Sequence, residues 1–237
     1  MRPPGTVAGS PSMSTTPPPL SSPPTRVEVR PGVWLDSRLA LWIAEERLLV
    51  AADLHWGYAA SHRARGHLLP VWGDDEIELR LRALVADYQP REMIWLGDVV
   101  HAAEGAARAE AFLRAPPVPI ALVAGNHDRR WRERGAPSRV HGGYFFHHGD
   151  QAAPVPSGAV EVMGHHHPAA TWNDGAGGRF KLPALVAGAR RWILPAFSPW
   201  AAGAPWSPAP GETLWAISPR RIFALPNVPA PANLPAS

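Results

Sequence analysis

The sequence contains no cysteine, and this absence narrows the chemistry open to the protein. Disulfide bonds, thiolate nucleophiles and sulfur-ligated metal ions are all excluded. A metal ion bound by this chain would therefore be held by His, Asp, Glu or Asn side chains or by backbone oxygen atoms.

Long apolar runs and lysine are also scarce. No run is long enough to cross a bilayer and the N-terminus lacks the apolar core of a secretory signal, so we expect a cytoplasmic protein without membrane contact. Lys181 is the only lysine, and almost all of the positive charge comes from arginine. The net charge of +3 and the pI of about 9.9 are compatible with a polyanionic partner but too modest to indicate one.

The 237 residues are enough for one large α/β domain with a sizeable core. Residues 1–25 are rich in Pro, Ser and Thr and have few apolar side chains to bury, so we expect a disordered tail there. The Pro- and Ala-rich residues 227–237 are interpreted in the same way. One folded domain is therefore predicted over residues 26–226.

Hydrophobic patterning predicts alternating strands and helices in the first half of the chain. Apolar runs predict strands at residues 47–52, 93–96 and 120–124, and apolar residues at helical spacing predict helices over 74–88 and 103–114. Shorter strand candidates precede them at residues 27–30, 33–36 and 39–44. Helical spacing disappears after Gly142, where short runs broken by Gly and Pro predict a second sheet. This order favours an α/β protein with a parallel or mixed sheet, whose ligands lie at the carboxyl ends of the strands.

Residues that commonly bind metal ions follow five of the predicted strands. The motifs are Asp53-Leu54-His55, Gly97-Asp98-Val99-Val100-His101, Gly125-Asn126-His127-Asp128, His147-His148-Gly149-Asp150 and Gly164-His165-His166-His167. Asp53 and His55 are two residues apart, so on an extended segment both would point to the same face. His165 and His167 have the same spacing. Asp98 could bridge two ions through its two oxygen atoms.

Mixed nitrogen and oxygen ligands of this kind suit Mn, Fe or Zn. Two such ions, roughly 3.5–4 Å apart, can clamp a phosphate and generate hydroxide for in-line attack on phosphorus.

In this order, the five motifs resemble those of the calcineurin-like metallophosphoesterase superfamily from about Leu48 to Pro168. The resemblance implies a two-sheet β-sandwich flanked by helices, in a four-layer α/β/β/α arrangement, with two divalent ions at the strand ends. Mn is the expected metal, with Fe or Zn as alternatives. The implied ligands are Asp53, His55, Asp98 and His167 for one ion, and Asp98, Asn126, His148 and His165 for the other. The implied proton donor to the leaving alkoxide is His127, with Asp128 or His101 orienting it.

Within the superfamily, the chain is most similar to the bacterial ligase-associated DNA damage response endonucleases. The similarity rests on Ala-Asp-Leu-His-Trp-Gly at residues 52–57, on residues 62–66 with Pro70, and on Leu-Pro-Ala-Phe at 194–197. It implies DNA as the phosphodiester substrate, and a repair ligase and helicase as partners.

Several residues have two interpretations. Arg63 and Arg65 either bind substrate phosphates or form a solvated helix face. Three tryptophans either stack on bases or pack against a sheet, namely Trp56, Trp200 and Trp206. His148 is preferred over His147 as a ligand because it directly precedes Gly149, and His166 is assigned no role.

The favoured function is a metal-dependent phosphodiesterase, in particular a DNA endonuclease associated with repair. One alternative is a phosphoesterase for a small nucleotide or a phosphomonoester. The other is a non-catalytic scaffold of the same fold, which should have lost metal ligands. None is missing from the pattern.

Overall fold

The computed structural model describes residues 25–133, 135–173, 177–201 and 203–225. The helices and strands run from Arg26 to Leu225. The predicted tails lie outside the described residues except for Thr25.

The first sheet is mixed and has six strands. In spatial order they are β1 (Arg26–Arg30), β2 (Val33–Asp36), β3 (Ala40–Ile43), β4 (Leu48–Ala52), β5 (Glu92–Leu96) and β6 (Ile120–Val123). The first four strands pair antiparallel, whereas β4, β5 and β6 pair parallel. Every residue of β4 is buried, as expected for a strand covered on both faces. Ala52 pairs with Leu96 and Leu96 with Val123, so the residues after these three strands meet at one edge.

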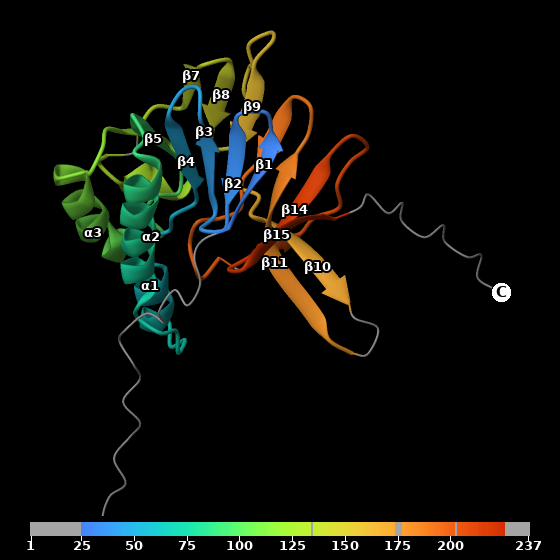
Figure 1. Ribbon diagram of the computed structural model, residues 1–237. Helices are drawn as coiled ribbons and strands as arrows, with labels where there is room; N and C mark the ends of the chain where they lie inside the picture. The colour runs from blue at the N-terminus through green and yellow to red at the C-terminus, as the bar shows by residue number, and fades with distance from the viewer. Residues whose placement is uncertain (1–24, 134, 174–176, 202, 226–237) are drawn as a thin grey trace, which may run out of the picture.

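Three helices lie beside the first sheet (Figure 1): α1 (Tyr58–Ala64), α2 (Gly73–Tyr88) and α3 (Ala103–Arg114). The predicted α2 and α3 are confirmed, because their apolar residues recur at helical spacing and Ile77, Leu81 and Phe112 enter the core. Three acidic residues in the first turn of α2 favour its N-terminus through the helix dipole. The helix α1 was not predicted, because it buries only Ala59 and Ser61 and so shows little periodicity.

The second sheet contains the remaining strands. Its main path runs through β13 (Ala204–Pro205), β10 (Pro168–Asn173), β11 (Arg179–Ala187), β12 (Arg191–Ile193), β9 (Val160–Met163), β8 (Tyr144–His147) and β7 (Ser138–His141). Off this path, β14 (Thr213–Ser218) pairs with β11 and β15 (Arg221–Leu225) pairs with β14. The strands β7, β10 and β13 were not predicted from the sequence. Phe197 N–H donates to the Ala52 carbonyl, which ties the segment after β12 to the end of β4.

The two sheets share one core, so the predicted two-sheet sandwich is confirmed. Leu35 and Leu41 of the first sheet belong to the same buried cluster as Phe146, Leu185 and Trp192 of the second. Figure 1 shows the helices on the side of the first sheet, and no α-helix follows α3 in the part of the chain that the structure describes. The outer helical layer that a four-layer arrangement places over the second sheet is therefore not found among these residues.

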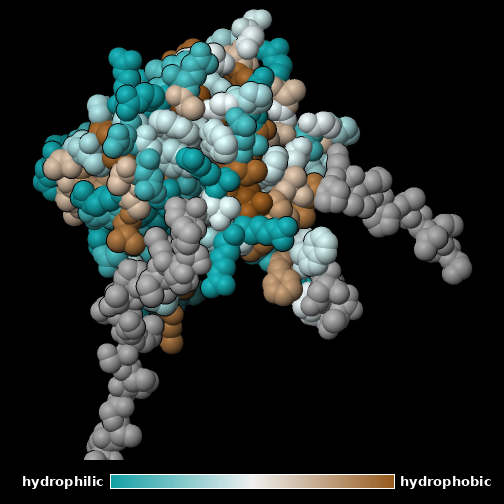
Figure 2. Space-filling model, viewed as in Figure 1, coloured by the Kyte–Doolittle hydropathy of each residue, from teal (hydrophilic) through white to brown (hydrophobic). Residues whose placement is uncertain are grey.

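The surface in the same view is mostly hydrophilic, with apolar side chains gathered near the middle (Figure 2). No helix within the described ranges is long and apolar enough to span a membrane.

Candidate metal centre

The candidate ligands come from loops that follow five different strands. Asp53 and His55 follow β4, Asp98 follows β5, Asn126 follows β6, His148 follows β8, and His165 and His167 follow β9. The structure brings all seven residues together in two adjacent clusters, although they come from five segments that are far apart in the sequence.

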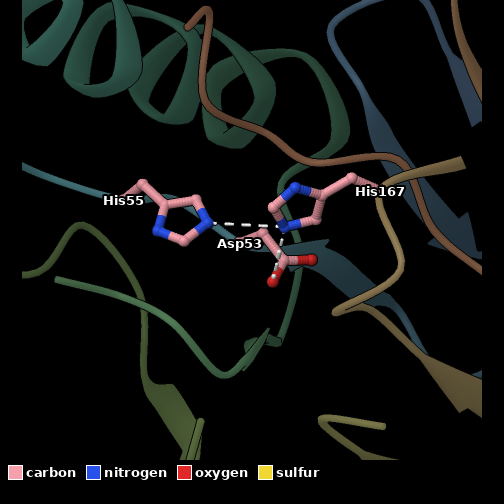
Figure 3. Close-up of side chains that lie close together, drawn as sticks. All are labelled: Asp53, His55 and His167. Carbon is pink, nitrogen blue, oxygen red and sulfur yellow. Dashed lines mark hydrogen bonds and ion pairs between the residues drawn. The ribbon is translucent and has the colours of Figure 1, made fainter. Parts of the chain in front are cut away.

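The first cluster consists of Asp53, His55 and His167, whose ligand atoms all lie within 4.8 Å of one another. His167 Nε2 is 3.2 Å from Asp53 Oδ1 and 3.4 Å from His55 Nε2 (Figure 3). Asp53 and His55 are buried, and Asp53 Oδ1 has no hydrogen-bond partner among the described residues. A buried carboxylate oxygen without a hydrogen bond, beside two imidazole nitrogens, fits a divalent cation.

The second cluster consists of Asp98, His148 and His165, again with ligand atoms within 4.8 Å of one another. His148 Nε2 lies 3.4 Å from Asp98 Oδ2, 3.2 Å from His165 Nδ1 and 3.1 Å from Asn126 Oδ1. Asn126 therefore joins this cluster. The other ring nitrogen, His148 Nδ1, is 3.0 Å from the backbone carbonyl oxygen of Leu96. A hydrogen bond there places the proton on Nδ1 and leaves the Nε2 lone pair for an ion.

The two clusters are in contact. His148 Nδ1 is 3.8 Å from Asp53 Oδ1, and the backbone N–H of His165 donates to Asp53 Oδ2 at 2.9 Å. The structure places the Asp98 carboxylate in the second cluster, close enough for its charge to affect the pKa of His55 and of His167 in the first. The expected bridging role of Asp98 stays a prediction.

The charges in this region favour a cation. Burial lowers the pKa of His55 to about 4 despite the nearby Asp53 and Asp98, so His55 is in the neutral form that binds metals. Burial also opposes protonation of His148, but its hydrogen bond to Asp98 and the charges of Asp53 and Asp98 outweigh burial and raise the pKa to about 9. The two carboxylates thus attract positive charge strongly, and a divalent ion would supply it.

The backbone at the candidate ligands has left-handed geometry. Positive φ angles occur at Asp53 (56°), His55 (52°), Asp98 (46°), His165 (64°) and His167 (44°). Such angles are unfavourable for residues other than glycine and are typical of functional sites.

These φ angles show that the motif residues are not in extended chain, so the expectation that they share a strand face is wrong. The strands β4 and β9 end at Ala52 and Met163, before the motif residues begin. Asp53 and His55 converge because the loop is strongly curved, not because they share a strand face. His165 and His167 do not share a face at all, since each enters a different cluster.

Two glycines of the motifs permit close approach of neighbouring loops. A Cβ atom on Gly125 would lie 2.1 Å from the backbone nitrogen of Asp98 and 2.3 Å from its Oδ1. A Cβ atom on Gly97 would lie 2.4 Å from His148 Nδ1. Only glycine fits such contacts without moving a candidate ligand. The motifs contained this signal, but the sequence alone did not show which loops approach each other.

His127 is exposed at the start of the 3₁₀ helix η1 (His127–Arg130), and its ring lies edge-on to the ring of His55 in the first cluster, with centroids 5.4 Å apart. Its Nδ1 lies 3.3 Å from the carbonyl oxygen of His101, and the two rings are stacked with their centroids 5.1 Å apart. A hydrogen bond from Nδ1 to this carbonyl would leave Nε2 available to exchange a proton with a substrate.

Asp128 is fully buried. Its carboxylate accepts hydrogen bonds from the backbone N–H groups of Val100 and Gly125, each at 3.1 Å. Within the described residues it makes no hydrogen bond to the His127 ring; the His101 carbonyl lies next to Nδ1 instead. Asp128 therefore joins the loops after β5 and β6, and burial raises its pKa to about 6.

The two candidate phosphate-binding arginines lie at the C-terminal end of α1. Arg63 Nη1 donates to the backbone carbonyl of Leu69 at 2.9 Å, so this side chain braces the loop that follows α1. Arg65 is exposed at the C-cap of the helix. Burial lowers the pKa of His101 to about 4, and the positive charge of Arg65 adds to this effect. Their substrate contacts stay a prediction.

Packing distinguishes between the two histidines proposed as ligands and between the two roles considered for the tryptophans. His147 Nε2 lies 2.9 Å from Glu161 Oε1, and it is His148 that joins the second cluster. Trp56 is fully buried and packs against Trp95 and Phe112, so it cannot stack on a base. Two other tryptophans are partly exposed: Trp200 packs on Trp72, and Trp206 lies beside His166.

A two-sheet sandwich with two groups of candidate nitrogen and oxygen ligands at its strand ends is an arrangement that suits a metal-dependent hydrolase. The family model of the calcineurin-like phosphoesterases matches residues 46–220, and the chain belongs to this family.

Among solved structures, the chain is similar to the nuclease MPE from Pseudomonas putida, with 25% sequence identity and a TM-score of 0.64. The match covers 86% of this chain and 100% of the other. A comparison with curated proteins found no match.

Proposed function

We propose that this protein is a two-metal phosphodiesterase that cleaves nucleic acid, in particular DNA, and acts beside a repair ligase and helicase. The main support is the contact between the two ligand clusters, where His148 Nδ1 and Asp53 Oδ1 are 3.8 Å apart. Two divalent ions bound there would stabilise the charge on a phosphate and activate water for in-line attack. The nucleic-acid substrate is supported by the similarity to a nuclease.

The protein residues would supply ligands and a proton. The first ion would be held by Asp53, His55 and His167 and the second by Asp98, Asn126, His148 and His165. Asp98 is proposed as a ligand of the first ion as well, because its charge also acts on His55 and His167. The leaving oxygen needs a proton as its bond to phosphorus breaks, and His127 is an exposed imidazole whose ring lies against that of His55 in the first cluster. The His101 carbonyl would hold the Nδ1 side of that ring away from the substrate.

Metal removal and replacement test this proposal. Protein treated with a chelator and then loaded with Mn is incubated with single-stranded DNA, nicked DNA, bis(p-nitrophenyl) phosphate, a small nucleotide and a phosphomonoester. We expect cleavage of DNA and of the model diester only after Mn is restored. Turnover of the diester without DNA cleavage would contradict the nucleic-acid substrate. Preferential turnover of the nucleotide or the monoester would favour the small-substrate alternative, and no turnover with full metal content would favour a scaffold.

A further inference from the structure

A cavity of about 640 Å³ opens beside the second cluster. Its lining residues fall within residues 124–129 and 135–138, between β6 and the start of β7, and within residues 147–154, at the end of β8 and after it. His148 belongs both to this lining and to the second cluster, so the cavity reaches the candidate metal centre. Its volume is in the range of roughly 300–1,000 Å³ that is usual for small-ligand sites.

The lining combines small apolar surfaces with a few polar groups. The apolar surfaces come from Ala124, Pro137, Ala152, Ala153 and Pro154. The polar side chains include Ser138, Asp150 and Gln151. Apolar lining suits the faces of a planar ring, and carboxylate and amide groups can form hydrogen bonds with the edge of such a ring.

The carboxylate of Asp150 favours the base of a nucleotide over its phosphate as the group bound in this cavity. It would repel a phosphate, but it can accept a hydrogen bond from the amino group of adenine, cytosine or guanine. The arginine of the lining is Arg129, which is exposed and lies two residues after His127 on η1. A guanidinium in that position suits the phosphate of a bound nucleotide, whereas the chemistry around Asp150 suits its base.

We propose that this cavity binds the nucleobase adjacent to the scissile phosphate, with Asp150 and Gln151 contacting the edge of the base. The inference rests on the proposed function, because the base reaches the cavity only when a phosphodiester lies at the metal centre. The base-binding site would lie on one side of the metal centre, and Asp150 and Gln151 would determine the preference for nucleotides over other phosphodiesters.

Two chromogenic diesters with the same leaving group test this proposal. One is the p-nitrophenyl ester of deoxycytidine 5′-monophosphate, which carries a base, and the other is bis(p-nitrophenyl) phosphate, which carries none. The measured quantity is the ratio of kcat/KM for the first ester to kcat/KM for the second, with Mn-loaded enzyme. The variants are Asp150→Ala and Gln151→Ala. The control is Glu45→Ala, which removes an exposed carboxylate from the turn before β4, at the opposite end of that strand from Asp53.

We expect wild type to prefer the nucleotide ester, and Asp150→Ala to lower the ratio roughly 10-fold because a base-edge contact is lost. Gln151→Ala should lower it in the same direction, while Glu45→Ala leaves it unchanged. A ratio unaffected by both cavity variants, or a wild type without preference, would overturn the proposal, even if a variant slowed both reactions through a change in folding. A wild type that hydrolyses neither ester would overturn the proposed function itself, and with it the base-binding site.

Discussion

Asp98 Oδ1 accepts a hydrogen bond from the backbone N–H of His127 at 2.8 Å. The other oxygen of the same carboxylate, Oδ2, lies 3.4 Å from His148 Nε2 in the second cluster. One buried side chain thus connects the candidate metal ligands to the loop that carries the candidate proton donor. Metal binding and the position of His127 should therefore depend on each other.

Replacement of Asp98 by Asn should show how far metal binding depends on the negative charge of this side chain, since its shape is kept. The variant Asp98→Asn keeps an oxygen that can accept the His127 N–H but removes the negative charge that an ion requires. We expect metal content to fall and phosphodiester turnover to drop roughly 100-fold or more. Elemental analysis and turnover measure this, with Glu104→Gln, an exposed carboxylate of α3, as the control. Full metal content with a wild-type rate would rule out Asp98 as a ligand.

Replacement of His127 should slow the chemistry without releasing metal. Its backbone N–H contacts Asp98, but its ring lies outside both clusters, so His127→Ala should retain the metal content of wild type. Cleavage of DNA should slow about 10²–10⁴-fold, because the leaving alkoxide needs a proton. Bis(p-nitrophenyl) phosphate should be affected much less, since p-nitrophenolate leaves without one. Equal losses on both substrates would contradict the role of His127 as a proton donor.

Gly125 should tolerate no side chain. In Gly125→Ala the new Cβ would meet the backbone nitrogen and Oδ1 of Asp98 at 2.1 and 2.3 Å, so Asp98 must move. We expect lower metal content and loss of most activity. Gly188→Ala is the matched control, because there the nearest atom is 3.2 Å away. Wild-type metal content and activity in Gly125→Ala would show that the loops after β5 and β6 can separate without harm.

A buried ion pair away from the metal centre should control stability. Arg38 contacts Asp36 at 2.7 Å and Asp87 at 2.6 Å, and the exposed fractions of the Arg38 and Asp36 side chains are 7% and 2%. Arg38→Ala would leave Asp36 buried without its main partner, which should cost about 3 kcal/mol of unfolding free energy. For a chain of this size, the expected drop in Tm is about 6–12 °C.

The surface pair of Arg82 and Glu78 provides the comparison for that prediction. Its side chains are 54% and 29% exposed. Arg82→Ala should therefore change the free energy of unfolding by less than about 1 kcal/mol. Thermal unfolding followed by circular dichroism measures both variants. Similar Tm values for Arg38→Ala and Arg82→Ala would mean that Asp36 finds compensation elsewhere, for example from the Tyr88 hydroxyl, which donates to its Oδ2 at 2.8 Å.

Local patterns in the sequence determined much of the fold. The buried run of β4 and the helical spacing in α2 and α3 depend on residues close in the chain, so their periodicity predicted these elements correctly. The seven candidate ligands were also recognisable, because the identity and order of the motifs are local features. The short α1 was missed because seven residues with two buried positions give too little periodicity to detect.

Tertiary structure decided how those residues are used. Left-handed backbone at His165 and His167 sends neighbouring ligands into different clusters, which no argument from strand spacing could show. Packing buries Trp56 beside Trp95 and hence removes it from the substrate side. Contacts between distant segments also placed the His101 carbonyl, rather than the Asp128 carboxylate, next to the His127 ring. Sequence thus specified the chemical groups of the site, whereas loop curvature and contacts across the two sheets specified their partners.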